Sequence, residues 1–200
     1  MTDVDDAVAA IRDGRLTIVP TDTVYGLATT PYDEDAVRGL YLAKGRVAQQ
    51  PTALVVRDIE LLLESLPDLD DATERVARVL LPGPYTLILP NPGRRFPWLA
   101  GSRPETLGVR VPGLAGSAHD VLDRARALVA TSANLPGGPD PHTLADVPEQ
   151  LRDAAAVLVD GGRLPGTPST VLDLTGEEPV VLREGAVSAE DALRAVASVL

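Results

Sequence analysis

The sequence predicts one α/β domain built on a twisted sheet of mixed parallel and antiparallel strands, with helices on both faces. Short apolar runs typical of buried strands alternate with segments whose apolar residues recur at helical spacing. The alternation lacks the strict strand–helix–strand rhythm of a purely parallel sheet, which favours a mixed sheet. The 200 residues, 44% of them hydrophobic, suffice for one sizeable core, and no linker or charge block divides them. A single domain over residues 1–200 is therefore expected.

Local signals define the elements of the first half of the chain. An amphipathic segment ends at Gly14, a buried strand ends at Pro20, and Asp33 is suited to cap a second helix. The elements expected here are, in order, a helix at 3–13, a strand at 16–19, a loop at 21–31, a helix at 33–43, a strand at 53–56, and helices at 59–65 and 71–81.

The second half is interpreted in the same way. A stretch rich in Pro, Gly and Arg at 91–104 is too long for a tight turn and is interpreted as a mobile flap. Ser188, with Asp191 three residues later, opens a C-terminal helix. The other elements expected are strands at 85–89 and 107–111, a helix at 117–127, a strand at 128–131, a helix at 147–154, a strand at 157–160, and a hairpin with strands at 171–174 and 180–182.

Composition excludes several classes of site. The chain has no cysteine, so it has no disulfide, thiolate metal site or cysteine nucleophile. His119 and His142 lack a second metal-type ligand at helical spacing and are interpreted as surface or packing residues, so no metal ligand is expected from the side chains. A net charge of −11 argues against salt-driven capture of a nucleic-acid backbone. An acidic N-terminus without a signal peptide, and no apolar run near the ~18 residues that a membrane span needs, predict a cytoplasmic protein.

A set of polar loops and scarce cations points to an anion-binding site. Lys44 is the single lysine among 18 basic residues, which indicates a need for a compact ammonium, although a lysine left on the surface by chance is the competing interpretation. Arg110 lies between two valines of a predicted strand, on a solvated or functional face. Loops with hydroxyl and amide groups follow predicted strands: PTDTVYG at 20–26, TSAN at 131–134 and PST at 168–170.

These loops are expected to meet at one edge of the sheet together with Lys44, Arg46, Arg110 and Arg183. Such a site suits an anion with several oxygens, phosphate being the obvious candidate, although each loop alone also fits ordinary turn chemistry. Neither the glycine-rich phosphate loop nor the dinucleotide fingerprint is present.

Seven segments, taken in order, resemble the YrdC/TsaC family of threonylcarbamoyl-AMP synthases across nearly the whole chain. They are VPTDTVYGL at 19–27, KGR at 44–46, LPGPYTL at 81–87, VRVP at 109–112, TSAN at 131–134, STV at 169–171 and LREG at 182–185. The resemblance implies the YrdC-like fold and a nucleotidyltransferase that forms threonylcarbamoyl-AMP and pyrophosphate from L-threonine, bicarbonate and ATP, with Mg²⁺ arriving with ATP. It also implies that the product serves the threonylcarbamoyl modification of tRNA through a separate transferase complex.

The resemblance also implies a role for particular residues. Lys44 and Arg46 are the expected catalytic pair, because they align anions and screen the charge of the leaving pyrophosphate. Lys44→Ala and Lys44→Arg are then expected to fold normally and to lose activity. The expected ATP and phosphate contacts are Lys44, Arg46, Ser132, Asn134, Ser169 and Arg183. The expected threonine and bicarbonate contacts are Thr23, Tyr25, Arg110 and Thr131.

The chain departs from the family pattern in two places. After Arg46 it continues VAQQPTA at 47–53, where relatives often have proline and later a Lys/His-Pro-Leu run. The loss of a charged residue near Gln50 leaves the details of the contact with threonine or phosphate open. It ends at Leu200, which matches the short, single-domain form.

Two other functions compete with this interpretation. A carbamoyl-adenylate-forming paralogue, like the related domain of hydrogenase-maturation carbamoyltransferases, is disfavoured because that domain normally sits in a longer chain with a zinc finger and other parts. An RNA-binding or ribosome-maturation module is disfavoured by the acidic charge and by the lack of an aromatic stacking platform. Tight binding of tRNA by the protein alone, in about 0.15 M salt, would favour the RNA-binding alternative.

Overall fold

The computed structural model describes residues 3–45 and 50–200, and its strands form one mixed sheet. The strand order is β7-β1-β2-β6-β3-β5-β4-β8-β9. The pairs β1–β7, β3–β5 and β4–β8 are parallel, and the other neighbours are antiparallel, which confirms the predicted mixed sheet. The strands are β1 Thr17–Val19, β2 Gly26–Thr29, β3 Ala53–Val56, β4 Tyr85–Pro90, β5 Thr106–Arg110, β6 Ala127–Ser132, β7 Val157–Leu158, β8 Thr170–Asp173 and β9 Val180–Arg183.

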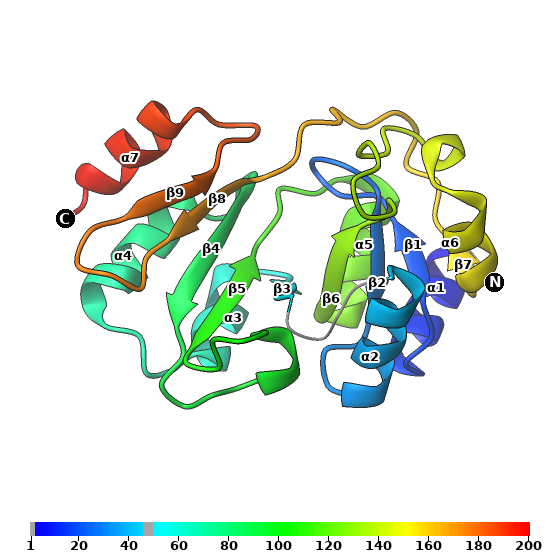
Figure 1. Ribbon diagram of the computed structural model, residues 1–200, viewed down its shortest axis with the longest axis horizontal. Helices are drawn as coiled ribbons and strands as arrows, with labels where there is room; N and C mark the ends of the chain where they lie inside the picture. The colour runs from blue at the N-terminus through cyan, green and yellow to red at the C-terminus, as the bar shows by residue number, and fades with distance from the viewer. Residues whose placement is uncertain (1–2, 46–49) are drawn as a thin grey trace.

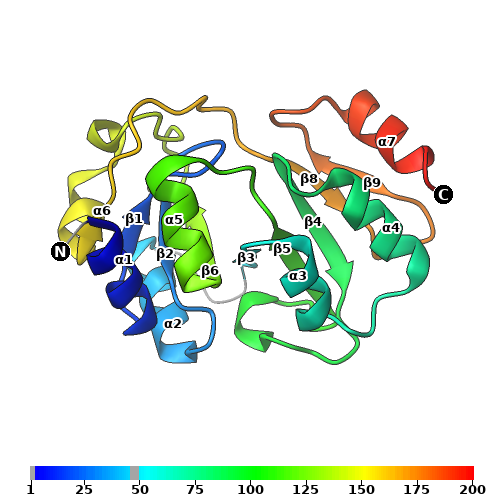
Figure 2. The same ribbon diagram turned by 180° about the vertical axis from the view of Figure 1, so that it is seen from behind.

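The helices fall into two groups around the two ends of the sheet (Figures 1 and 2). Helices α1, α2, α5 and α6 lie around β7, β1, β2 and β6, whereas α3, α4 and α7 lie around β5, β4, β8 and β9. The helices are α1 Asp3–Arg12, α2 Glu34–Ala43, α3 Ile59–Ser65, α4 Asp71–Leu80, α5 Gly116–Ala125, α6 Glu149–Ala154 and α7 Ala189–Ala197, with 3-10 turns η1 Pro97–Leu99 and η2 Leu144–Asp146.

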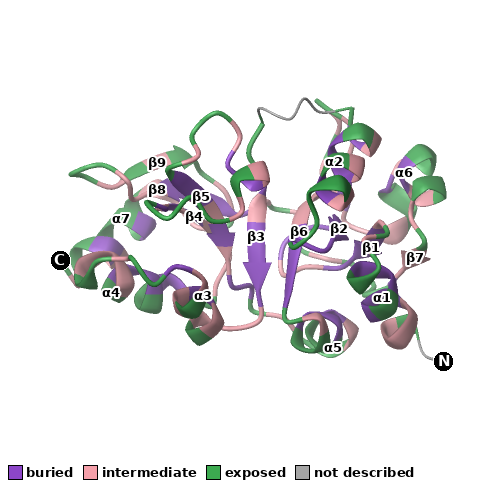
Figure 3. Cartoon of the chain, turned by 90° about the horizontal axis from the view of Figure 1, so that it is seen from below, coloured by how far each residue is buried: buried purple, intermediate pink, exposed green. Residues whose placement is uncertain are grey.

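Alternating side chains along the strands build a core on each face of the sheet. Leu27 and Val129 belong to a large buried cluster with residues of α2, α3, α4, α6 and α7. Their chain neighbours Ala28 and Leu128 belong to a second cluster with residues of α1 and α5. Because successive side chains of a strand point to opposite faces, helices cover both faces, as predicted. Figure 3 shows the buried residues gathered in the strands and on the inner sides of the helices.

Several boundaries differ from the predictions, and one strand was missed. Strand β2 lies inside the predicted loop at 21–31 and pairs with both β1 and β6. All four of its residues are buried, so it shows no polar alternation to reveal it. Helix α5 ends two residues earlier than predicted, where Arg126 adopts a positive φ of 69°. No helix among residues 3–45 and 50–200 is long and apolar enough to cross a membrane.

The segment at 91–104 is anchored to the rest of the fold. The buried side-chain amide of Asn91 donates to the carbonyl of Arg95 at 2.8 Å, and its oxygen accepts from the Arg95 amide at 2.9 Å. Later in the same segment, the carbonyl of Leu99 accepts a hydrogen bond from the Thr52 amide at 3.0 Å. Leu99 itself is fully buried. These contacts fix η1 beside β3, and motion of the segment as a flap stays a prediction.

Candidate active site

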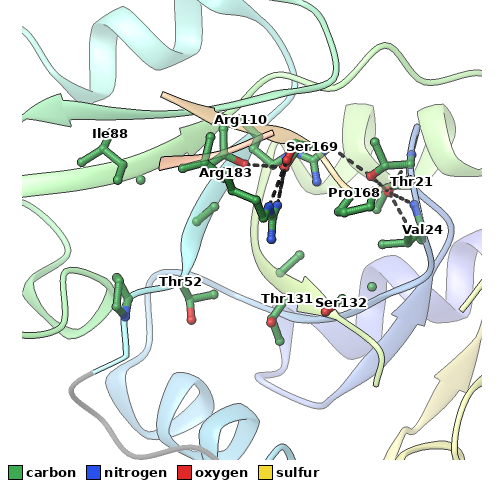
Figure 4. Close-up of a pocket in the computed structure, with 18 of the residues that line it drawn as sticks. Thr21, Val24, Thr52, Ile88, Arg110, Thr131, Ser132, Pro168, Ser169 and Arg183 are labelled. Atoms are coloured by element: carbon green, nitrogen blue, oxygen red, sulfur yellow. Dashed lines mark hydrogen bonds between the residues drawn. The ribbon is translucent and has the colours of Figure 1, made fainter. Parts of the chain in front are cut away.

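A cavity of about 300 Å³ lies between the two ends of the sheet. This is within the range of small-molecule sites, which are typically about 300–1,000 Å³. Its walls come from β2, β3 and β6 and the loop after β1 on one side, and from β4, β5, β8 and β9 on the other (Figure 4). Of the residues predicted from the sequence, those that line it are Thr23, Arg110, Thr131, Ser132, Ser169 and Arg183.

The charges around the cavity favour an anionic ligand. Arg103, Arg110 and Arg183 line it, whereas Asp140 is the only acidic residue among the described lining residues. Arg103 and Asp140 also line the cavity and were not predicted from the sequence, because they meet the other lining residues only in the folded chain. The lining residues Thr21, Thr52 and Thr86 lie in the segments quoted above, at 20–26, 47–53 and 81–87, but no role was predicted for them individually.

Arg110 is the most deeply placed of these cations. Val109 is fully buried in the core, and the alternation along β5 therefore turns Gly108 and Arg110 toward the cavity. Arg110 Nη2 donates to Asp22 Oδ1 at 2.6 Å and to Thr23 Oγ1 at 3.4 Å. Burial lowers the pKa of Arg110, the Asp22 carboxylate opposes this, and the charge of Arg183 lowers the pKa further. A bound anion would relieve both unfavourable effects.

The loop after β1 is held in shape by Thr21. Its Oγ1 accepts hydrogen bonds from the backbone amides of Thr23 and Val24, both at 3.2 Å, and donates to the Val24 carbonyl at 2.6 Å. Such side-chain bonds to nearby backbone groups fix a tight turn. The turn places Thr21, Thr23 and Val24 on the wall of the cavity (Figure 4).

Ser169 and Arg183 meet on the opposite wall, where Figure 4 shows them beside Arg110. Arg183 Nη2 donates to the Ser169 carbonyl at 2.8 Å and to Ser169 Oγ at 3.2 Å. Ser169 Oγ also lies 2.8 Å from Thr86 Oγ1. The three residues present two hydroxyls and a guanidinium to the cavity. This is a suitable set for phosphate oxygens.

Lys44 holds the TSAN loop from behind. Its side chain is 1% exposed, and Nζ donates to the Ser132 carbonyl at 2.5 Å, to Asn134 Oδ1 at 2.7 Å and to the Asn134 carbonyl. Ser132 Oγ donates to Asn134 Oδ1 at 2.8 Å, and Asn134 Nδ2 donates to Asp140 Oδ1 at 3.2 Å. Lys44 and Asn134 are not among the residues that line the cavity.

The contact of Lys44 and Asn134 with a ligand stays a prediction. Arg46, the other residue of the predicted catalytic pair, lies outside the described residues, as does the start of the run at 47–53. From the end of that run, Pro51, Thr52 and Ala53 line the cavity.

Tyr25 ties the loop after β1 to the segment that follows β7. The side chain is fully buried, its hydroxyl lies 2.8 Å from the Gly162 carbonyl and 3.1 Å from Asp160 Oδ1, and it accepts from the Gly161 amide at 2.9 Å. Burial raises the pKa of Tyr25; the Gly161 amide opposes this shift and Asp160 adds to it. Val24 and Gly26 line the cavity and Tyr25 does not. Its predicted contact with threonine stays a prediction.

Tyr25→Phe is expected to lower the free energy of unfolding by about 1–2 kcal/mol, because the hydrogen bonds between the Tyr25 hydroxyl and the backbone of Gly161 and Gly162 are lost. Urea unfolding of the two proteins measures the difference. Tyr32→Phe is the matched control, since Tyr32 is 62% exposed. Equal stability of Tyr25→Phe and the control would show that the hydroxyl does not anchor the segment.

Gly185 lies so close to the cavity wall that a side chain has no room. A Cβ at this position would lie 2.2 Å from the Pro168 carbonyl oxygen and 2.6 Å from the Ser169 carbonyl carbon. Gly185→Ala is therefore expected to displace both residues and to reduce activity by about tenfold or more while lowering Tm. At Gly176, in the neighbouring hairpin, the nearest atom would be 3.6 Å away, so Gly176→Ala is expected to leave both quantities nearly unchanged. Equal activity of the two variants would contradict this assignment of the wall.

Comparisons with known proteins show which family the chain is similar to. The Sua5–YciO–YrdC family model, described as "Telomere recombination", matches residues 9–185. The chain is 35% identical to a threonylcarbamoyl-AMP synthase of Sodalis glossinidius, over 92% of this chain and 96% of that protein. It is 35% identical to the threonylcarbamoyl-AMP synthase of Pyrococcus abyssi, over 92% of this chain, and it spans 54% of the length of that relative.

A solved structure extends the likeness to the fold. The crystal structure of Pyrococcus abyssi Sua5 in complex with L-threonine superposes with a TM-score of 0.89 at 32% identity. The match covers 100% of this chain and 59% of that one.

Proposed function

We propose that this chain, which belongs to the Sua5–YciO–YrdC family, condenses L-threonine, bicarbonate and ATP into threonylcarbamoyl-adenylate and pyrophosphate. The observation that carries the proposal is the cavity whose wall joins three arginines with hydroxyls from several strands and loops. Two relatives are named threonylcarbamoyl-AMP synthase, and one relative was solved in complex with L-threonine. These findings support the choice of substrates.

The chemistry needs alignment and charge compensation more than acid–base catalysis. The amine of threonine attacks bicarbonate to give a carbamate, with loss of water. A carbamate oxygen then attacks the α-phosphorus of ATP, and the bond to pyrophosphate breaks. Both steps bring anions together, so cations and hydroxyls that hold them in line contribute most of the rate enhancement.

The two sides of the cavity suit different parts of the substrates. On the β8–β9 side, Ser169, Thr86 and Arg183 offer the donors that phosphate oxygens accept. Deeper in the cavity, Arg110 offers a guanidinium that matches a carboxylate or carbamate. The threonine carboxylate is assigned to Arg110, and the triphosphate to Arg183 and the TSAN loop.

Mg²⁺ is assigned to the ATP phosphates. Among residues 3–45 and 50–200, no group of three or more acidic or histidine side chains is placed to hold a metal ion. Magnesium commonly keeps several waters and binds through substrate phosphates with one or two carboxylates. This fits a cavity in which Asp140 is the single acidic residue among the described lining residues. When bound, the ion neutralises charge on the leaving pyrophosphate.

The adenylate is proposed to pass to a separate transferase complex that modifies tRNA. An acidic chain with a net charge of −11 has little attraction for the tRNA backbone itself. The protein alone is therefore expected to bind tRNA weakly near physiological salt.

The proposed activity is tested by the release of pyrophosphate from ATP by the purified protein. Release is expected only when L-threonine, bicarbonate and ATP are all present. Release without threonine would indicate ATP hydrolysis or another acceptor for the carbamoyl group. A folded protein that binds ATP and releases nothing would contradict the proposal.

A further inference from the structure

A buried ion pair joins two parts of the cavity wall that are far apart in the chain. Asp22 lies in the loop between β1 and β2, and Arg110 ends β5, with β2, β6 and β3 between β1 and β5 in the sheet. Arg110 Nη2 and Asp22 Oδ1 are 2.6 Å apart, and the two side chains are 13% and 9% exposed. The loop after β1 is thus tied directly to the opposite half of the sheet.

Arg110 and Asp22 form one hydrogen bond with each other, whereas a bidentate pair would form two. Arginine and carboxylate groups often pair through two parallel N–H···O bonds. Here Arg110 Nε and Asp22 Oδ2 are buried without a hydrogen-bond partner in the described part of the protein. Desolvated charges that are incompletely bonded stabilise a fold poorly, and neutral replacements of buried ion pairs are often as stable. The pair therefore contributes little to stability for the burial it requires.

The ion pair with Asp22 fixes the orientation of the Arg110 side chain. Among the described residues, Arg183 also acts on the Arg110 guanidinium, which it repels. Without Asp22, a flexible arginine side chain in this wall is expected to turn toward solvent and away from Arg183.

We propose that Asp22 is a positioning residue, which holds the Arg110 guanidinium in the cavity wall for the carboxylate of the amino-acid substrate. The inference rests on the proposed function for the identity of that amino acid. Asp22 acts through Arg110 and makes no contact with the substrate.

The test uses calorimetric binding of L-threonine, and of L-threoninol, which lacks the carboxylate, to wild type, Asp22→Asn, Arg110→Gln and the double variant. Asp22→Asn is expected to weaken binding of L-threonine by about tenfold or more. Its binding of L-threoninol, and its KM for ATP, are expected to stay within about twofold of wild type. In the Arg110→Gln background, Asp22→Asn is expected to add less than about twofold, because the residue it positions is gone. Asp13→Asn, an exposed carboxylate paired with Arg15, is the matched control.

Two results would overturn the inference. One is a loss of L-threonine affinity in the double variant that equals the product of the losses in the two single variants. The other is a KM for ATP that rises in Asp22→Asn as much as its Kd for L-threonine. If Asp22→Asn does not fold, the double variant decides, because it leaves no unpaired buried charge. A folded double variant with wild-type affinity for L-threonine would also overturn it. Wild type that binds neither compound would remove the proposed function and this inference together. Equal binding by wild type and Asp22→Asn would remove this inference alone.

Discussion

Lys44→Ala is expected to lower the free energy of unfolding by about 3 kcal/mol and to reduce adenylate formation by about a hundredfold or more. Nζ donates to three oxygens of Ser132 and Asn134 from a site that is 1% exposed. Removing the ammonium leaves those partly buried acceptors without that donor and leaves a space behind the loop. Because Ser132 lines the cavity, the loop and the substrate site lose their shape together.

This expectation revises the one drawn from sequence alone, which was normal folding of Lys44→Ala and Lys44→Arg. The burial of the side chain makes Lys44→Arg unfavourable as well, since a planar guanidinium is larger than the ammonium it replaces. Chemical denaturation and pyrophosphate release measure the two effects separately. Arg38→Ala on the same helix is the control, because Arg38 is 60% exposed in its pair with Glu34. A Lys44→Ala protein as stable as this control would show that Lys44 does not support the loop.

Arg183→Gln is expected to reduce kcat/KM for ATP by about a hundredfold, with the fold intact. The guanidinium is held by the Ser169 carbonyl and hydroxyl on the cavity wall, where the phosphates are assigned. Glutamine keeps a similar length and polarity but loses the charge that the phosphates require. Steady-state kinetics with each substrate varied in turn are the measurement. The Kd for L-threonine is expected to change little, in contrast to its change in Asp22→Asn.

Arg194→Gln provides the matched control for this variant. Arg194 is 66% exposed on α7 and pairs with Glu190 and Asp191 in water. Surface pairs of this kind are worth about 0–1 kcal/mol, so activity and stability are expected to stay at the wild-type level. A loss in Arg183→Gln that falls on threonine and leaves ATP unaffected would reverse the assignment of the two sides of the cavity.

Most of the sheet and its helices followed from local signals in the sequence. Asp33 and Ser188 cap α2 and α7 as predicted, and their side chains accept the amide hydrogens that the helix starts leave unpaired. Strand β2 was missed because every one of its residues is buried between β1 and β6. A strand buried on both faces has no alternation of polar and apolar residues to reveal it.

The sequence predicted which residues belong to the site better than it predicted how their side chains are arranged. Thr23, Arg110 and Ser169 line one cavity, although they come from distant segments. Thr23 lies in the loop after β1, Arg110 ends β5 and Ser169 directly precedes β8, and all three strands belong to one sheet. Which way a side chain points depends on packing that no local pattern encodes. Tyr25 thus turns into the core, and Lys44 turns behind the loop that it holds. Asp22 lies within the PTDTVYG run, but its partner is 88 residues away.

The cavity is proposed to join threonine, bicarbonate and ATP into one product. The decisive measurement is incubation of the protein with ATP, Mg²⁺, L-threonine and ¹³C-bicarbonate, followed immediately by liquid chromatography and mass spectrometry. We expect a threonylcarbamoyl-adenylate peak that gains one mass unit from the label and disappears when threonine is omitted. A labelled adenylate that forms without threonine, or pyrophosphate released with no adenylate carrying the label, would contradict the proposal.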